Sequence, residues 1–153
     1  MDEPNNGDLR SALAHLPTAT YVLTSAHDGE RAGVLVEWVA PAASEPVLVS
    51  VSVLKGHSIE PLIRDSHAFA LCRVDRDDRL MLKKFATPCA PDERSDPFDS
   101  IAVRTLATGS PVIARSLVVL DCEVVRHFDL EADHELYVGR VIAARLEEKV
   151  DKH

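Results

Sequence analysis

Long apolar stretches are missing from this 153-residue sequence, in which no run approaches the roughly 20 residues that a membrane-spanning helix needs. The N-terminus, MDEPNNGDLR, also lacks the basic and apolar regions of a signal peptide. Positive charge is scarce, because 17 Lys and Arg residues face 25 Asp and Glu residues and give a formal net charge of -8. We therefore expect a cytoplasmic protein that binds neither membranes nor nucleic acids.

The chain has only three cysteines, Cys72, Cys89 and Cys122, and they form no C-x-x-C pair. This spacing argues against a zinc ribbon and against a thioredoxin-type site. Cys72 and Cys122 lie in apolar runs and are expected to be buried. Cys89 lies between prolines and is expected to be exposed, with no cation or base nearby in sequence to activate its thiol.

Several motifs of catalysis and cofactor binding are absent as well. The sequence has no G-x-S-x-G, no Walker A and no G-x-G-x-x-G motif, which argues against a Rossmann site for a tightly held dinucleotide. A nicotinamide cofactor would therefore have to bind loosely and leave. No second histidine stands at metal-ligand spacing from His134, so we expect no metal site.

What the sequence does contain is a succession of short strand patterns joined by turns. Hydrophobic residues make up 46% of the chain, enough for the core of a single domain over 1–153, with 1–7 and 149–153 expected to fray. Strands are predicted at 19–27, 31–40, 47–54, 67–74, 111–130 (with a bulge or bend) and 134–148. Helices are predicted at 8–15, 59–65 and 77–86, loops at 41–46 and 87–100, and a tight hairpin at Asp28-Gly29. This order predicts a closed or nearly closed antiparallel barrel that carries small helices.

The turn Lys55-Gly56-His57-Ser58 joins a predicted strand to a predicted helix. Ser58 is the expected N-cap of that helix, as Asp8 is of the first helix. A helix N-terminus with a glycine, a cation and two hydrogen-bonding side chains would suit a phosphate group. The same four residues also fit an ordinary capped turn with surface Lys and His, and taken alone they favour the capped turn.

Three other positions could serve either a ligand or only the fold. Trp38 could stack on a planar ligand, with Glu37 bonding to a ligand ring or ribose, or it could fill the core. His134 beside Asp133 could be a general acid or base, or an ordinary turn residue. An isolated Asp-His dipeptide favours the ordinary turn residue. Gly139 in mid-strand predicts a bulge or the close approach of a ligand.

Taken in order, these segments resemble the flavin reductase-like family, the FMN-binding split barrels. The matching segments cover 16–144, nearly the whole domain. They are LPTATYVLTS, the Asp28-Gly29 hairpin, AGVLVEWVA, SEPVLVSVSV, KGHS with its helix, HAFALCRV, LKKFA, GSPVIARSLVVLDCEV and DHELYVGRV. The last segment is the most specific, and the order of all of them is more specific than any one.

The resemblance implies a mainly β fold, a six-stranded antiparallel split β-barrel with a few short helices, which forms a homodimer with flavin near the subunit interface. It implies FMN, or FAD in its place, and NAD(P)H as the donor of hydride to flavin N5. The reduced flavin would serve a monooxygenase or another electron acceptor. A flavin-binding electron carrier without its own NAD(P)H site is the alternative, and a barrel that has lost its cofactor is a third.

The resemblance also assigns roles to residues. His134 matches the family histidine close to the flavin and nicotinamide pocket and is the expected catalytic residue. The expected flavin-binding residues are Val36, Glu37, Trp38 and Val39 at the ring, Ser52, Val53, Leu54, Lys55, His57 and Ser58 at the ribityl chain and phosphate, and Lys83, Lys84 and Phe85 at the phosphate. The chain departs from the family at Glu37-Trp38, where small hydroxyl residues are frequent. A carboxylate beside the ring would disfavour a reduced anionic flavin unless it faces away or is protonated.

Overall fold

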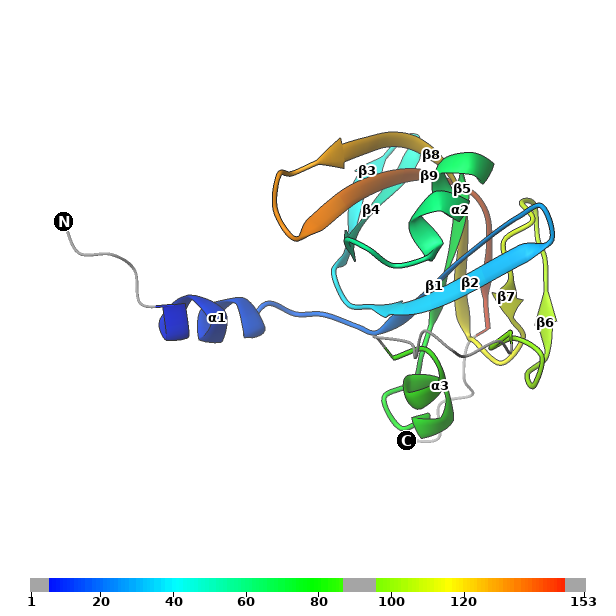
Figure 1. Ribbon diagram of the computed structural model, residues 1–153, viewed down its shortest axis with the longest axis horizontal. Helices are drawn as coiled ribbons and strands as arrows, with labels where there is room; N and C mark the ends of the chain where they lie inside the picture. Colours follow the sequence, from blue (N-terminus) through cyan, green and yellow to red (C-terminus); the bar gives the residue numbers. More distant parts are fainter. Residues whose placement is uncertain (1–5, 87–95, 148–153) are drawn as a thin grey trace.

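Seven antiparallel strands form one sheet, in the order β2-β1-β5-β8-β9-β4-β3. The computed structural model describes residues 6–86 and 96–147 (Figure 1). The strands of this sheet are β1 (Tyr21–His27), β2 (Glu30–Val36), β3 (Val39–Ser44), β4 (Val47–Leu54), β5 (Ala68–Arg73), β8 (Val118–Asp129) and β9 (His134–Leu146). Two short strands, β6 (Val103–Arg104) and β7 (Val112–Ile113), pair with each other. The predicted mainly β, antiparallel fold is confirmed.

The sheet curls into a split barrel because its two edge strands are neighbours in sequence. Only Glu37 and Trp38 separate β2 from β3, although these strands lie at opposite ends of the strand order. The Ser52 N–H donates a hydrogen bond to the Trp38 carbonyl at 3.0 Å, which ties this connection to β4. The barrel stays open along the line where β2 and β3 face each other.

The prediction of a single strand over 31–40 is wrong. The chain leaves the strand conformation at Glu37 and Trp38, so one expected strand becomes two, and seven strands stand where six were expected. Residues 41–46, predicted as a loop, mostly belong to β3. This segment pairs with β4 despite its proline, because a bulge between Pro41 and Ala43 absorbs the irregularity.

The β1–β2 and β8–β9 hairpins of the sheet differ in regularity. Asp28 and Gly29 both have positive φ angles, 51° and 80°, which is the two-residue turn that the Asp-Gly sequence predicts. The long β8–β9 hairpin carries register shifts between Asp121 and Cys122 and between Val124 and Arg126, which add to its curvature.

The strand predicted over 111–130 is also divided. It begins as β7, turns out of the sheet, and resumes as β8. Arg145 of β9 stabilises the turn, because its guanidinium donates to the carbonyls of Ile113, Ala114 and Ser116.

Three helices accompany the barrel. α1 (Asn6–Ala14) stands away from the body with no buried residue, and it begins before Asp8, which is therefore not its N-cap (Figure 1). α2 (Ile59–Ser66) packs the apolar side chains Ile59, Leu62 and Ile63 into the barrel interior. α3 (Arg79–Lys84) is capped by Asp78, whose carboxylate accepts from the Met81 N–H at 3.3 Å. None of the described helices is long and apolar enough to cross a membrane.

Two clusters of buried residues form the core, one inside the barrel under α2 and one between β1, β5 and α3. Cys72 and Cys122 are buried, as predicted, whereas Cys89 and most of the predicted 87–100 loop lie outside the described residues. Gly139 packs against protein: a Cβ atom there would lie 2.6 Å from the ring of Phe69. The glycine is therefore required by core packing, and no ligand is needed to explain it.

Candidate functional site

The connection between β2 and β3 presents an aromatic side chain at the surface. Trp38 is 43% exposed, which excludes the alternative that it fills the core. Its ring centroid lies 4.7 Å from that of His134, with the planes inclined by 39°. The His134 Nδ1 lies 2.9 Å from the Asp133 carboxylate, and this hydrogen bond lowers the pKa of Asp133. The result is an exposed indole against a half-buried imidazole, which we call the Trp38–His134 pair.

The turn 55–58 follows β4 directly and lies beside this pair, because Leu54 is opposite His134 in the β4–β9 ladder. The Lys55 ammonium donates to Asp129 Oδ1 at 2.9 Å, which raises the pKa of Lys55 and lowers that of Asp129. The Lys55 N–H donates to the Asp133 carbonyl and the Gly56 N–H to Glu60 Oε2. Donors predicted to hold a phosphate therefore already have partners within the chain.

Ser58 occupies the N-cap position of helix α2, as predicted, but its side chain makes no cap hydrogen bond. The cap bond comes from His57 instead. The Ile59 N–H donates to His57 Nδ1 at 3.0 Å, and the Glu60 N–H donates to the His57 carbonyl at 3.2 Å. Burial lowers the pKa of His57, which favours the neutral ring that can accept at Nδ1.

Beneath this turn lies a polar cluster, buried at its two glutamates, that the sequence pattern did not single out. The Tyr137 hydroxyl donates to Glu60 Oε1 at 3.1 Å. His127 Nε2 lies 3.0 Å from Glu135 Oε1, and the His127 ring stacks on Tyr137 at 4.3 Å. Four side chains from α2, β8 and β9 thus form a chain of contacts, which we call the Glu60–Glu135 cluster.

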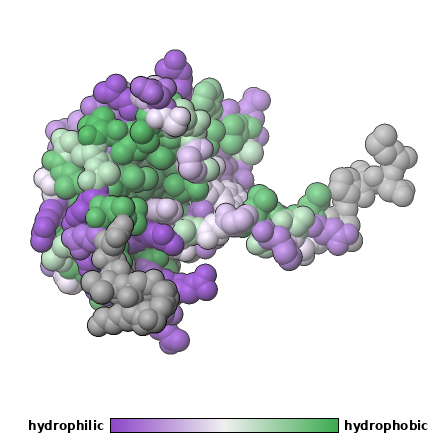
Figure 2. Space-filling view, turned by 180° about the vertical axis from the view of Figure 1, so that it is seen from behind, coloured by the Kyte–Doolittle hydropathy of each residue, from purple (hydrophilic) through white to green (hydrophobic). Residues whose placement is uncertain are grey.

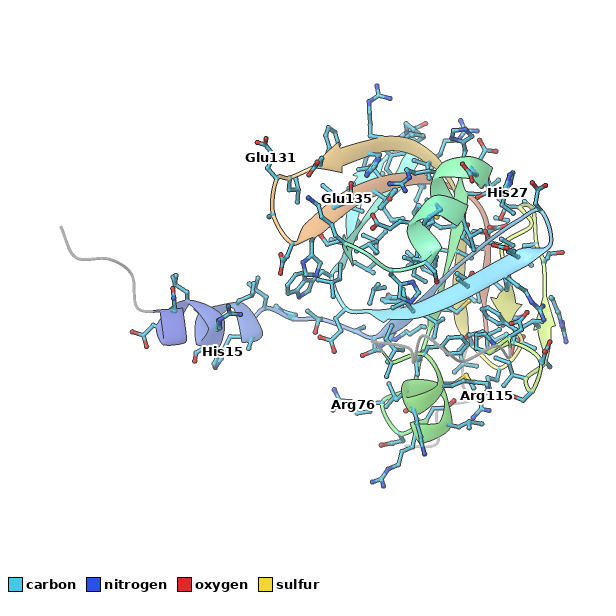
Figure 3. The ribbon with its side chains drawn as sticks, viewed as in Figure 1. His15, His27, Arg76, Arg115, Glu131 and Glu135 are labelled. Atoms are coloured by element: carbon cyan, nitrogen blue, oxygen red, sulfur yellow. The ribbon has the colours of Figure 1, made fainter. Side chains whose placement is uncertain are left out.

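A groove of about 820 Å³ opens at the end of the molecule that carries α3. Glu37 lines this groove, whereas the adjacent residue Trp38 packs against His134. The two residues of the β2–β3 connection therefore belong to two different surfaces. Arg73, Arg76 and Arg115 also line it, and Figure 3 shows Arg76 and Arg115 near α3, far from Glu135. We call this cavity the arginine groove.

The arginine groove is lined by three arginines and four carboxylates, Glu37, Asp75, Asp78 and Glu147, so its charges are mixed. Arg115 forms an ion pair with Asp78 at 2.8 Å. Arg73 and Arg76 have no ion-pair partner among residues 6–86 and 96–147. Within the same ranges, no cluster of three or more His, Cys, Asp or Glu side chains is placed to hold a metal ion.

A protein-family model described as "Flavin reductase like domain" matches residues 13–153. The chain belongs to this family. The resemblance proposed from the sequence is thereby confirmed over nearly the whole chain.

Individual relatives show how such domains are used elsewhere. The chain is 28% identical over 142 residues to the reductase component of a 4-nitrophenol 4-monooxygenase/4-nitrocatechol 2-monooxygenase from Rhodococcus opacus, covering 92% of this chain and 72% of that protein. It is 25% identical over 142 residues to diflavin flavoprotein A 1 of Synechocystis sp., covering 92% of this chain. The match spans only 24% of the diflavin protein, as it does for other curated relatives of this type.

The fold comparison agrees with the family assignment. The NADH:FAD oxidoreductase of Streptomyces globisporus superposes with a TM-score of 0.82 at 23% identity, over 96% of this chain and 87% of that one. At this identity the likeness supports the fold alone.

The site residues expected of this flavin reductase-like domain do not form one contact cluster. Trp38, Leu54, Lys55 and His134 lie together at the exposed end of the β4–β9 ladder. The remaining positions are half-buried or exposed and are spread over several elements. They are Val39 on β3, Ser52 on β4, His57 and Ser58 in the turn 55–58, Glu37 in the arginine groove, and Lys83 and Lys84 on α3.

Three of the expected positions have side chains in the core: Val36, Val53 and Phe85. The Phe85 ring lies 5.2 Å from that of Phe98, and its carbonyl accepts from the Leu35 N–H. These side chains therefore pack in the core and not at the surface. Their assignment to flavin binding stays a prediction.

Proposed function

We propose that this flavin reductase-like protein is an NAD(P)H-dependent flavin reductase that binds FMN, with FAD as an alternative flavin. The observation that carries the proposal is the Trp38–His134 pair with its exposed indole. It adjoins the arginine groove in sequence, because Trp38 follows Glu37, which lines the groove. A groove of about 820 Å³ is within the size range of small-molecule sites, about 300–1,000 Å³. The residues present therefore fit a flavin by size, aromatic surface and cationic groups.

When bound, the flavin supplies an electron acceptor at N5, to which the nicotinamide donates hydride. Trp38 offers a ring face for a planar ligand. His134, held by Asp133, presents a fixed imidazole beside that face. Arg73 and Arg76 offer guanidinium groups that suit a phosphate, since neither is neutralised by a described carboxylate.

We place the phosphate at the arginine groove in preference to the turn 55–58. The ammonium of Lys55 and the amide of Gly56 are already held by Asp129 and Glu60, so a phosphate there would have to displace two carboxylates. Comparison of FMN with riboflavin tests this choice, because the two differ only in the phosphate. Arg76→Gln should abolish the preference for FMN, whereas Lys55→Gln should retain it.

We also propose that the protein acts as a homodimer and passes its reduced flavin to a partner oxygenase or another electron acceptor. The face of β4, β8 and β9 turned away from α2 carries apolar side chains at Leu54, Phe128, Leu136 and Val138. Figure 2, seen from behind, shows hydrophobic residues gathered on the body of the molecule. This outer apolar face is the proposed contact between copies. The Rhodococcus opacus relative, named a reductase component, supports an oxygenase as acceptor.

The decisive experiment is the visible absorption spectrum of the purified protein, before and after FMN is added and the mixture is gel-filtered. We expect flavin bands, and we expect NADH or NADPH to bleach them in the absence of oxygen. Flavin bands that neither nucleotide bleaches would indicate the electron carrier instead. If no flavin is retained, quenching of free FMN fluorescence separates loose binding from a barrel that binds no flavin, and the second result would overturn the proposal.

A further inference from the structure

A second cavity lies on the side of the barrel that carries the β1–β2 hairpin. It has a volume of about 340 Å³, and its wall includes Ser66, His67, Thr108, Ser110 and Glu123. These residues come from the C-terminal end of α2, from the segment that precedes β7 and from β8. Because three of the five side chains carry a hydroxyl group, we call this space the hydroxyl cavity.

The hydroxyl cavity is separate from both surfaces proposed to hold the flavin. It shares no lining residue with the arginine groove. Glu123 of its wall pairs with β9 at a position six residues beyond His134, a length of about 20 Å along a strand. Figure 3 shows His27, the neighbour of the lining residue Ala26, far from Glu135. A small molecule in this cavity would therefore not contact the proposed flavin site.

A buried hydroxyl group without a partner belongs to the wall of this cavity. Ser110 is 1% exposed, and its Oγ has no hydrogen-bond partner among residues 6–86 and 96–147. A buried polar atom that stays unpaired costs free energy, so folded proteins rarely retain one unless water or a ligand binds it. The only other such atom in the described ranges, Nε of Arg145, belongs to a guanidinium that already donates to three carbonyls.

The other two hydroxyl groups of the cavity have already used their protons. Thr108 Oγ1 donates to Asp121 Oδ1 and accepts from the Ser110 N–H at 3.2 Å. Ser66 Oγ donates to the Ala68 carbonyl and accepts from the Ala68 N–H, both at 3.2 Å. A hydroxyl group has one proton, so each of these two can only accept from a ligand. The hydroxyl cavity therefore offers a ligand more acceptors than donors.

Negative charge adds to this surplus of acceptors. Glu123 is exposed and forms no ion pair within the described ranges. Asp121, the partner of Thr108, is fully buried. Its carboxylate is held by three uncharged donors, the N–H groups of Ala107 and Thr108 and the Thr108 hydroxyl. Both carboxylates therefore favour a cation in the cavity between the donors and solvent.

Two basic side chains lie close to the cavity and have to be weighed against these carboxylates. His67 lines the cavity and is exposed. Arg140 is opposite Glu123 in the β8–β9 ladder, so the two side chains lie on the same face of the sheet. No ion pair of 4.0 Å or less joins them. The Glu123 carboxylate is therefore available to a cation from solution.

We propose that the hydroxyl cavity binds a small primary amine in its protonated form, with the ammonium group donating to Ser110 Oγ and to the acceptors around it. An alkylammonium group has three donors and no acceptor, which complements a wall with acceptors to spare. The volume of about 340 Å³ is at the lower end of the range for small-molecule sites, about 300–1,000 Å³, so the ligand is smaller than a nucleotide. This site is additional to the proposed flavin reductase activity and does not rest on it.

The test is an NMR titration of the full chain, labelled with ¹⁵N and without added flavin, with butane-1,4-diamine and separately with 2-aminoethanol at pH 8. Alkylammonium groups stay protonated at this pH. We expect saturable shifts of the Gly109 and Ser110 amides with at least one of the two amines. Butane-1,4-diol and succinate, of comparable length, are the neutral and anionic counterparts of the diamine. They should bind about tenfold more weakly or not at all, because hydrogen bonds from a charged donor are the stronger ones.

Three variants locate the site. Glu123→Gln retains the shape but removes the charge, and it should weaken amine binding by about 3- to 10-fold. Ser110→Ala should also weaken binding without lowering the urea midpoint of the free protein, because the hydroxyl that it removes has no described partner. Arg140→Gln removes a neighbouring cation and should strengthen binding, a change that damage to the fold would not produce.

The matched control is Glu131→Gln, which makes the same change of charge in the turn between β8 and β9. It should leave the affinity for the amine unchanged. The proposal is overturned if neither amine shifts Gly109 and Ser110 in a saturable way, which would mean that the cavity holds water only. It is also overturned if the diol binds as tightly as the amines, or if Glu131→Gln weakens binding as much as Glu123→Gln, which would indicate attraction to the net charge of -8 alone. A protein that binds no flavin would leave each of these outcomes unaffected.

Discussion

His134 is the residue on which the proposed chemistry most depends. Its ring lies against Trp38, and its Nδ1 is taken by the Asp133 carboxylate. Among residues 6–86 and 96–147, the structure gives its Nε2 no hydrogen-bond partner. A histidine oriented on one side and free on the other is suited to contact a nicotinamide while its own position stays fixed.

We predict that His134→Ala lowers turnover of NAD(P)H by about 10- to 100-fold, because misplacement of reacting groups by about 1 Å can have an effect of this size. FMN affinity should fall by a smaller factor, since Trp38 and the groove arginines remain. Steady-state oxidation of NADH and fluorescence titration with FMN measure the two quantities.

The matched control is His27→Ala, at the β1–β2 hairpin, which Figure 3 shows far from Glu135, the residue next to His134. It should change neither quantity. Equal losses of turnover and FMN affinity in His134→Ala would assign His134 to flavin binding and count against a role in hydride transfer.

The buried position of Glu60 is a feature of a single residue that could not be predicted from the sequence. A glutamate in the first turn of a short helix is ordinarily a solvated residue that favours the helix dipole. Its partner Tyr137 lies more than seventy residues further along the chain. Only the curling of the sheet brings Tyr137 of β9 next to α2 inside the barrel, and no local pattern reports that curling.

At the scale of elements, the start of α2 depends on an imidazole that must stay neutral. The Ile59 N–H donates to His57 Nδ1, and a protonated ring could not accept there. Burial lowers the pKa of His57 below its ordinary value of 6.5. A lowered pKa in the folded protein means that the stabilisation is complete above the ordinary value and is lost as pH falls through the lowered one.

We predict that His57→Ala lowers the free energy of unfolding at pH 7.5 by about 1 kcal/mol, the usual effect of losing an N-cap. Ser58→Ala should stay within about 0.5 kcal/mol of the unsubstituted protein, because the Ser58 side chain makes no cap bond. Urea unfolding across a pH series measures both.

The difference between His57→Ala and the unsubstituted protein should shrink as pH falls below 6.5. A difference that is constant with pH, or a larger loss for Ser58→Ala, would contradict the assignment of the cap to His57.

The sequence predicted some elements well because their patterns are local. VLVSVSVL alternates apolar and hydroxyl residues, and β4 has the same bounds and the same alternating burial. The break between β2 and β3 has no such signal, since GVLVEWVA reads as a continuous strand of strong β formers. The chain turns there because β3 joins the far edge of the curled sheet, which is a property of the whole barrel.

At the scale of the whole molecule, the arginine groove is assembled from segments that are distant in sequence. Residues 18–20, 73–76 and 115–118 contribute to it together with Glu37, Asp78 and Glu147. None of the three arginines belongs to a recognisable motif, whereas KGHS and LKKF are local patterns from which a phosphate site can be predicted. The family resemblance led to the correct fold, and the phosphate site at KGHS and LKKF stays a prediction beside the proposed one in the groove.

The outer apolar face raises the question of what covers it. Leu54 and Phe128 are 48% and 46% exposed, and Leu136 and Val138 lie beside them on the same side of the sheet. Contiguous apolar surface of this kind is uncommon on monomers and marks contact sites. α1 adds exposed Leu9 and Leu13 on a helix that touches little of its own body, and a second copy could bind both surfaces (Figure 1).

We predict that the protein has a solution mass of roughly twice the 16.8 kDa chain and that Phe128→Glu dissociates it. A central apolar anchor replaced by a charge should weaken association by about 2 kcal/mol or more, because such anchors dominate the binding energy of an interface. Sedimentation velocity over a range of concentrations measures the shift.

Leu80→Glu is the matched control, since Leu80 is a similarly exposed apolar residue on α3 at another end of the molecule. A monomeric unsubstituted protein would contradict the dimer. Dissociation by Leu80→Glu, with Phe128→Glu unaffected, would place the interface at α3 instead, next to the arginine groove.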